Sequence, residues 1–380
     1  MGGASIASRN GQQINMGNPA SFDAIDSLGF MFEFAVNAKT SQFSNNLGNA
    51  TASDVNFQYF AMNFQISNKM GASIGMVPFS DVGYNVVVDD VVKNTGAVRT
   101  TYYGAGTISN AFLGFAFEPF KNVSIGANLN YYFGMLNRNT EVVYSDAADF
   151  YNLQQYKSLR INDFSFDFGA QATIPLQNKN KIILGAVFEN NPKYNAKYSD
   201  ITQKNIQYGS GNNASIDQDT LFYVSEKDGI IEFPFTYGFG ISYVKENKLE
   251  INFDYYHQSW SDAKFLGSKS AFLTDLNKFA LGGEWIPDKF SIKSFTSRIA
   301  YRAGLKYEQT YLIFNNHQIN DFGITFGVGL PVYRSKSTIN VAAEFGKKGT
   351  TDNNLVLENY FRLNLMVNLY DMWFIKRRFD

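Results

Sequence analysis

The feature that most constrains this chain is a repeated stretch of roughly 10 to 13 residues in which apolar and polar side chains alternate. In residues 359–370 one parity is apolar from Phe361 to Leu369, while the other includes Arg362 and Asn368. Successive side chains of a strand face opposite sides, so such a stretch suits lipid on one face and water on the other. A tilted strand crosses a bilayer in about 9–11 residues, whereas strands of globular proteins average about 5–6. The length favours a membrane barrel over a soluble sandwich.

About fourteen such segments occur, and an even number fits a closed bacterial barrel. They lie near 28–38, 54–66, 70–80, 108–118, 122–135, 160–174, 181–190, 233–244, 248–258, 277–286, 297–307, 320–331, 337–347 and 358–370. Short links alternate with longer connections, as in barrels with periplasmic turns and extracellular loops. The longer connections are 39–53, 81–107, 136–159, 191–232, 259–276, 308–319 and 348–357. We predict an all-β fold, an antiparallel transmembrane β-barrel of about 14 strands.

Composition excludes several other classes. Mean hydropathy is −0.22, and no apolar run reaches the ~18 residues that a membrane-spanning helix needs. Cysteine is absent, which gives no support to a disulfide scaffold or a cysteine-ligated metal. A net charge of −1 does not suggest a nucleic-acid partner. No complete nucleotide-binding or metal-ligand motif appears, so we predict no cofactor and no metal site.

Three segments can be distinguished along the chain. Residues 1–27 are rich in Gly, Asn and Ser, too short for a domain, and are expected to lie inside the barrel as a plug or hatch. Their beginning lacks the basic and apolar regions of an export signal, so that signal is expected to be missing from this sequence. Residues 28–370 are predicted to form the barrel. Residues 371–380 are a basic tail, expected on the periplasmic side.

Three separated blocks carry a resemblance to a known family. They read Phe233-Pro234-Phe235 through Tyr243, then Leu249 through Tyr256 and Trp260-Ser261; Lys278 through Trp285 with Arg298 through Tyr307; and Met1-Gly2-Gly3-Ala4 with Asn18-Pro19-Ala20-Ser21. The first block resembles a hairpin of the FadL-type (OmpP1/FadL/TodX) outer-membrane transporters of hydrophobic compounds. The middle block resembles the next hairpin of that family, and the N-terminal block is similar to its hatch. Together the blocks cover most of the chain in the right order.

The resemblance implies an outer-membrane barrel of a Gram-negative bacterium whose lumen is closed by an N-terminal hatch. Hydrophobic molecules such as long-chain fatty acids would be captured outside and released passively, sometimes sideways through a kinked strand. The basic tail departs from the family pattern and is more like FadL-like barrels that serve in multi-protein machines. The alternative is therefore a non-transporting adaptor in a secretion or assembly complex. Expected partners are outer-membrane lipid, a hydrophobic ligand and, for the adaptor, other outer-membrane or periplasmic proteins.

A cationic row is the first candidate ligand site. Arg298, Arg302 and Lys306 share one parity, so all three are expected to point into the lumen. There they could hold a carboxylate headgroup by charge-assisted hydrogen bonds. They could equally form a salt-bridge network with lumen acids such as Glu284.

Two further sites concern gating. Pro78 and Gly83 interrupt the third predicted strand, and a proline cannot donate to the ladder, which suits a kink that opens sideways. Pro78 could instead simply end the strand. Asn18, Pro19 and Ala20 are expected to form the hatch turn, either as a gate or as a static part of the plug.

Aromatic residues in two of the long connections could form an outer capture groove, or belong to the girdle at the membrane interface. They include Tyr144, Phe150, Tyr151, Tyr156, Tyr194, Tyr198 and Tyr208.

An enzyme is the remaining alternative. His257 and Ser259 lie two residues apart, hence on one face of a strand, as base and nucleophile of a barrel phospholipase could. A catalytic triad also needs an orienting third group, which the sequence does not identify. We therefore predict that the protein is not an enzyme and assign no catalytic residue.

Overall fold

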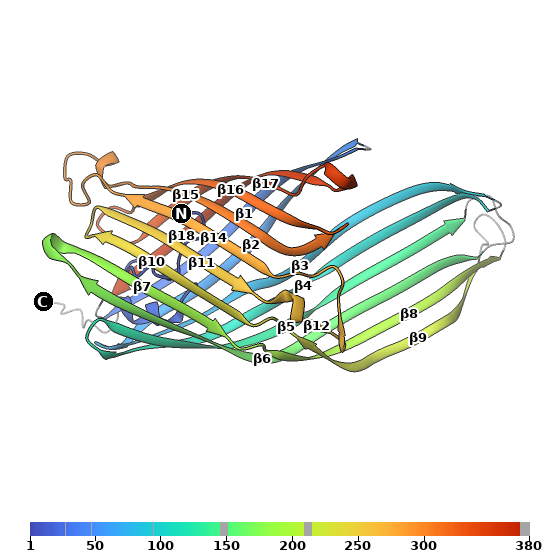
Figure 1. Ribbon diagram of the computed structural model, residues 1–380, viewed down its shortest axis with the longest axis horizontal. Coiled ribbons are helices and arrows are strands. Elements are labelled where there is room, and N and C mark those ends of the chain that lie inside the picture. The colour runs from blue at the N-terminus through green and yellow to red at the C-terminus, as the bar shows by residue number, and fades with distance from the viewer. Residues whose placement is uncertain (27, 47, 94, 145–150, 209–214, 373–380) are drawn as a thin grey trace, which may run out of the picture.

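Fourteen antiparallel strands form a closed barrel in the computed structural model, which describes residues 1–26, 28–46, 48–93, 95–144, 151–208 and 215–372 (Figure 1). The wall strands are β1 (Gly29–Asn45), β2 (Gly48–Ser67), β3 (Met70–Val92), β4 (Gly96–Phe120), β5 (Val123–Tyr144), β6 (Asn152–Pro175), β7 (Asn180–Glu189), β10 (Thr236–Lys245), β11 (Leu249–Gln258), β14 (Leu276–Trp285), β15 (Ala300–Phe314), β16 (His317–Pro331), β17 (Thr338–Lys348) and β18 (Leu357–Met372). Each predicted segment corresponds to one of these strands, so the predicted barrel is confirmed. The ring closes where β1 pairs with β18.

Six strands reach well beyond the others at one end of the barrel (Figure 1). β3 to β6 continue past the ring, and the hairpin of β8 (Lys193–Tyr208) and β9 (Ser215–Glu232) pairs with the far half of β6. We call this sheet the extension, its end of the barrel the extension end, and the opposite end the turn end. The short strands β12 (Lys264–Phe265) and β13 (Ser268–Lys269) pair beside β9.

The prediction of long connecting loops at 39–53, 81–107, 136–159, 191–232 and 308–319 is wrong, because strands run through most of each. Beyond the membrane both faces of a strand can meet water, so the apolar and polar alternation that marks a strand is lost. The other regular elements are the 3-10 turns η1 (Pro19–Ala24), η2 (Gln177–Lys179), η4 (Trp260–Asp262), η5 (Thr296–Arg298) and η6 (Asp352–Asn354). None of the helices in the described residues is long and apolar enough to cross a membrane.

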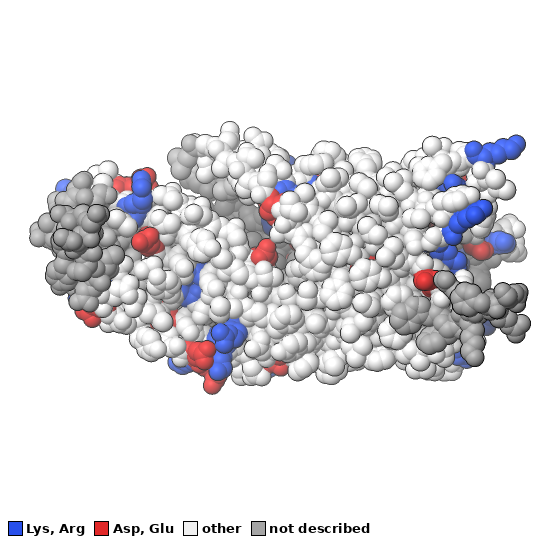
Figure 2. All heavy atoms as spheres, turned by 180° about the vertical axis from the view of Figure 1, so that it is seen from behind, with Lys and Arg blue, Asp and Glu red and all other residues white. Residues whose placement is uncertain are grey.

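The outside of the ring is an apolar belt. On β6, Phe164, Phe166 and Phe168 are all exposed, and the neighbouring strands repeat this pattern. Figure 2 shows few charged side chains across this region, whereas charges gather toward both ends. A soluble monomer rarely exposes an apolar surface of this extent, and a barrel in lipid requires one.

The inside of the ring holds the N-terminal segment. We call residues 1–26 the plug. The Asp254 carboxylate accepts hydrogen bonds from the backbone N–H groups of Ser5 and Ile6 at 2.5 and 2.8 Å. The Glu33 carboxylate accepts one from the N–H of Ile14 at 2.9 Å. Wall carboxylates thus satisfy backbone donors of a segment that has little secondary structure of its own.

Glycines in the wall make room for the plug. A Cβ added at any of eight positions on eight strands would collide with plug atoms, in most cases backbone. These positions, which we call the glycine ring, are Gly71, Gly114, Gly126, Gly169, Gly185, Gly240, Gly282 and Gly304. The plug backbone therefore lies closer to the wall than any side chain would allow.

Candidate functional site

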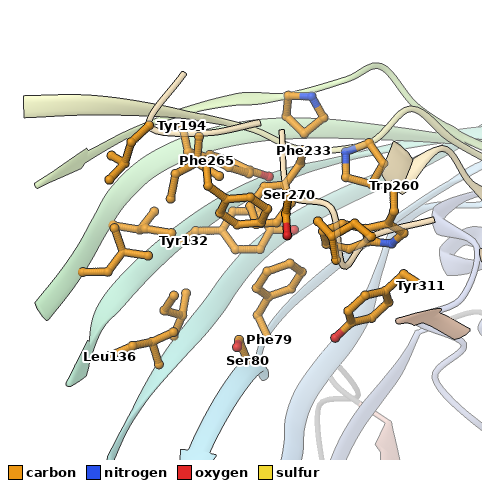
Figure 3. Close-up of a pocket in the computed structure, with 18 of the residues that line it drawn as sticks. Phe79, Ser80, Tyr132, Leu136, Tyr194, Phe233, Trp260, Phe265, Ser270 and Tyr311 are labelled. Carbon is orange, nitrogen blue, oxygen red and sulfur yellow. The ribbon is translucent and has the colours of Figure 1, made fainter. Parts of the chain in front are cut away.

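A cavity of about 850 Å³ lies at the extension end of the lumen. We call it the aromatic cavity, because rings from β3, β5, β8 and the segments around β12 and η4 point into it (Figure 3). Its wall combines a few buried aliphatic side chains, such as Ile108 and Ile161, with these rings. Phe272 and Leu273, in the connection that leads into β14, and Phe314, at the end of β15, complete the lining.

Phe233 lies at the centre of the ring network (Figure 3). Its centroid is 4.9 Å from that of Tyr194, 5.5 Å from Phe79 and 5.7 Å from Trp260, and all three contacts are edge-to-face. Trp260 in turn stacks on Tyr311 at 4.6 Å. Edge-to-face and stacked rings attract beyond simple burial, so the shape of the cavity is held by its own lining.

Polar and charged side chains also line the aromatic cavity. Arg138 forms no salt bridge within the described residues, whereas Lys157 lies 3.7 Å from the Asp200 carboxylate. Tyr198 donates a hydrogen bond to Asp200 at 2.8 Å. Burial, together with this bond to Asp200, raises the pKa of Tyr198 to about 12. The lining thus presents mainly apolar rings, together with Arg138, the Lys157–Asp200 pair and the carboxyl group of Glu189.

Two further cavities continue along the lumen. One of about 360 Å³ lies between the plug and β11 and shares Gln258 with the aromatic cavity. The other, of about 640 Å³, lies at the turn end and is lined by Gln12 and Gln13 of the plug. The plug therefore does not fill the whole lumen but leaves several separate cavities along it.

The predicted kink lies beside the aromatic cavity. β2 pairs with β3 only as far as Phe60 opposite Met76, and beyond that point β3 pairs with β4 alone. The β3 to β4 register shifts between Pro78 and Ser80, so that the Phe79 ring enters the cavity. Gly83 lies farther along β3 in regular pairing with Ala105. We call the unpaired stretch between β2 and β3 the seam.

The predicted hatch turn is buried at the start of η1. Asn18 accepts a hydrogen bond from the N–H of Ala20 at 3.0 Å and donates one to the Ile6 carbonyl at 2.8 Å. Pro19 occupies the first turn of η1, where a missing N–H costs nothing. The turn is tied both to the rest of the plug and to the wall, because Asn18 also donates to the Ala170 carbonyl.

The three predicted cations have different surroundings. Arg302 pairs with Glu284 at 2.6 Å, and Lys306 pairs with Glu344 at 2.8 Å. Arg298 lines the cavity at the turn end, packs on the Phe295 ring and has no salt bridge within the described part of the chain. Two of the three are thus already neutralised by wall acids, and the carboxylate role stays a prediction.

Sequence reasoning missed most of the aromatic cavity. Of the aromatics predicted for a capture groove, Tyr194 and Tyr198 line it, while Phe150 lies outside the described residues, as do 373–380 of the tail. A further signal was Phe79, which lies next to the predicted kink at Pro78. No group of three or more His, Cys, Asp or Glu side chains that could hold a metal occurs in the described ranges.

Solved structures with the same fold include proteins described as toluene transporters and as a FadL homologue. The Ralstonia pickettii toluene transporter TbuX matches with a TM-score of 0.57 at 14% identity, covering 93% of this chain and 92% of that one. The Pseudomonas putida toluene transporter TodX gives 0.56 at 15%, covering 98% and 96%. A Pseudomonas aeruginosa FadL homologue gives 0.57 at 11%, covering 97% and 96%. At these identities the likeness shows the fold alone.

At the level of sequence, no curated protein matches the chain. A family model described as BamG matches residues 1–380. The FadL-type resemblance is supported by the solved structures, at the level of the fold.

Proposed function

Because the chain belongs to the BamG family and has the fold of hydrophobic-compound channels, we propose that it lies in the outer membrane of a Gram-negative bacterium and lets hydrophobic molecules cross passively. The observation that carries this proposal is the aromatic cavity. Ligand sites are typically mostly apolar spaces of about 300–1,000 Å³ with few polar groups, and this cavity agrees in both respects. The structures it resembles are described as toluene transporters and a FadL homologue.

The proposed ligands are long-chain, fatty-acid-like molecules. An acyl chain would pack among the rings around Phe233, while Arg138, which has no salt bridge among the described residues, would offer positive charge to a carboxylate at the cavity wall. Compact aromatic hydrocarbons would pack on the same rings and would need no contact with a cationic side chain. Arg298, with no salt bridge of its own among the described residues, remains the candidate for a second carboxylate contact at the turn end.

The seam is the proposed exit. A ligand in the aromatic cavity would touch Phe79. Phe79 belongs to the part of β3 beyond Met76, which does not pair with β2. The straight route is closed by the plug, whose backbone fits against the glycine ring. Sideways release into the membrane would need no movement of the plug and no energy source.

The test is uptake of a fluorescent long-chain fatty acid into proteoliposomes, together with its affinity in detergent. Ile108 is 3% exposed and lines the cavity, so Ile108→Trp should fill it and weaken binding by roughly tenfold or more. Ile74→Trp, on the lipid face of β3, is the matched control and should bind normally. Uptake by the wild type no faster than by protein-free liposomes would refute transport.

The exit can be tested separately at Pro78. Pro78→Val restores an N–H donor to the strand edge beside the seam. We expect delivery of the probe into the bilayer to slow several-fold while its affinity in detergent stays unchanged. Pro175→Val, at the turn end of β6, should alter neither quantity. Equal delivery by both variants would exclude an exit at this seam.

A second function, as an adaptor subunit in an outer-membrane complex, is favoured by the extension. β3 from Ser80 to Val92 pairs with β4 only, and Val86, Val88 and Val91 are exposed on it. Native proteins usually protect such a long apolar edge. A stoichiometric protein that co-purifies from native membranes with a lumen free of lipid would support the adaptor and count against transport.

A further inference from the structure

A serine, a histidine and an asparagine meet on the outer wall of the barrel. The Ser259 hydroxyl lies 3.3 Å from His257 Nε2, and His257 Nδ1 lies 2.9 Å from Asn277 Oδ1. His257 lies near the end of β11, Ser259 follows directly after that strand, and Asn277 is directly opposite His257 on β14. The structure thus supplies the orienting third group that the sequence left unidentified.

The hydrogen bonds fix the role of each nitrogen. Asn277 Oδ1 is an acceptor, so His257 Nδ1 carries the proton and donates it. The lone pair on Nε2 then faces the Ser259 hydroxyl, which is the arrangement of a general base beside a nucleophile. Asn277 is held in turn, because its oxygen also accepts from the Tyr255 hydroxyl at 2.9 Å and its amide donates to Gln309 at 3.4 Å.

The surroundings keep the imidazole in place and leave it reachable. The Tyr237 ring packs against the His257 ring at 5.0 Å. His257, Ser259 and Asn277 are all partly exposed rather than buried. The backbone N–H that follows the nucleophile, on Trp260, donates no hydrogen bond within the part of the chain that the structure describes. A free N–H at that position is a typical oxyanion donor in serine hydrolases.

The three residues lie where the wall leaves the apolar belt. On β11 the outward residues Ile251, Phe253 and Tyr255 lead from the turn end to His257. Side chains of alternate parity, such as Asp254, face the plug instead. A molecule that reaches Ser259 with its acyl chain along this outward row would be a membrane lipid rather than a lumen ligand.

We propose that Ser259, His257 and Asn277 form a hydrolase site for carboxylic esters of membrane lipids on the outer face of the wall, whereas the aromatic cavity lies on its inner face and shares only Trp260 with this site. Ser259 Oγ attacks the ester carbonyl while its proton passes to His257 Nε2, and the Trp260 N–H would donate to the oxyanion that forms. The imidazolium returns the proton to the leaving alcohol, which leaves an acyl-serine. Water, deprotonated by the same nitrogen, then releases the fatty acid and restores the serine. Asn277 is a positioning residue, since it acts through His257.

The experiment uses the whole protein in detergent micelles. Labelling by a fluorophosphonate probe and hydrolysis of a long-chain p-nitrophenyl ester and of phosphatidylethanolamine in mixed micelles are measured. We expect the wild type to be labelled and active, and Ser259→Ala to be unlabelled, with activity reduced roughly 10³-fold or to background. Ser261→Ala, whose N–H is bound by Asp275, is the matched control and should behave as wild type. An unlabelled, inactive wild type, or equal loss in both variants, would overturn the proposal.

The positioning role needs its own readout. Asn277→Leu should lower kcat on the order of tenfold or more with little change in KM, because the imidazole loses its orienting acceptor. Asn277→Asp should restore activity and move the acid limb of the pH profile to higher pH, since a carboxylate stabilises the imidazolium. Failure of the aspartate variant to restore activity, in a barrel that still shows heat-modifiable migration, would remove Asn277 from the site.

Discussion

Replacing Gly126 and Gly185 together by valine is expected to drive the plug from the lumen and turn a closed barrel into an open channel. A Cβ at Gly126 would collide with the backbone of Pro19 and Ala20, and one at Gly185 with the backbone of Ile6. Backbone that is already anchored to Asp254 cannot move aside as a flexible side chain could. Valine itself suits a strand, so the barrel should still form.

The measurement is single-channel conductance in planar bilayers, where we expect a rise on the order of tenfold or more, because wide barrels without a plug conduct ions. Gly83→Val is the matched control, since a Cβ there meets nothing within 4 Å. If the double variant migrates as a folded barrel and still conducts like the wild type, the close fit of plug and wall does not seal the lumen. The single variant Gly185→Ala provides a milder test should the double variant fail to insert.

The second large effect is expected on stability, at Glu344. This side chain is 6% exposed and accepts from Lys306 at 2.8 Å, Tyr360 at 3.0 Å and Arg362 at 3.1 Å. Glu344→Leu leaves two cations without this carboxylate inside the wall. Removing one member of a buried ionic network typically costs about 3–5 kcal/mol, because the other charges stay desolvated.

Urea unfolding in detergent or lipid measures this cost. Glu226→Gln is the control, since Glu226 is an exposed partner of Arg160 and Lys197 in the extension, and exposed pairs contribute about 0–1 kcal/mol. A loss at Glu344 no larger than at Glu226 would mean that water in the lumen screens the network. That result would also indicate that Lys306 is accessible to an anionic ligand.

The wall could be predicted from sequence because its chemistry is set locally. Within the membrane each strand has lipid on one face, so the period-2 pattern of 359–370 or 160–174 was sufficient to place β18 and β6. In the extension that pattern disappears. Near its end β3 reads Val86-Val87-Val88-Asp89-Asp90, and all five residues are exposed, so neither face is marked and the sequence indicates a loop there.

The sites could not be predicted in the same way, because they depend on register between distant strands. The pairing of β11 with β14 across an intervening connection puts Asn277 opposite His257, and nothing near Asn277 in the sequence indicates this. Similarly, Phe233 meets Phe79 although they are far apart along the chain. The pairing of Arg302 with Glu284 was a stated alternative, and it follows from their facing positions on adjacent strands.

The closure of the ring by its first and last strands has a consequence for how the protein reaches this state. β1 pairs with β18, from Gly29 opposite Met372 to Ser44 opposite Leu357. In the plug, the N–H of Gly2 donates a hydrogen bond to the Thr325 hydroxyl of β16. Neither end of the chain can find its partner until almost all of it has been synthesised. Such non-local pairing makes folding slow and leaves β-edges exposed while it is incomplete. The newly made chain must therefore be kept soluble and unpaired until the last strand arrives.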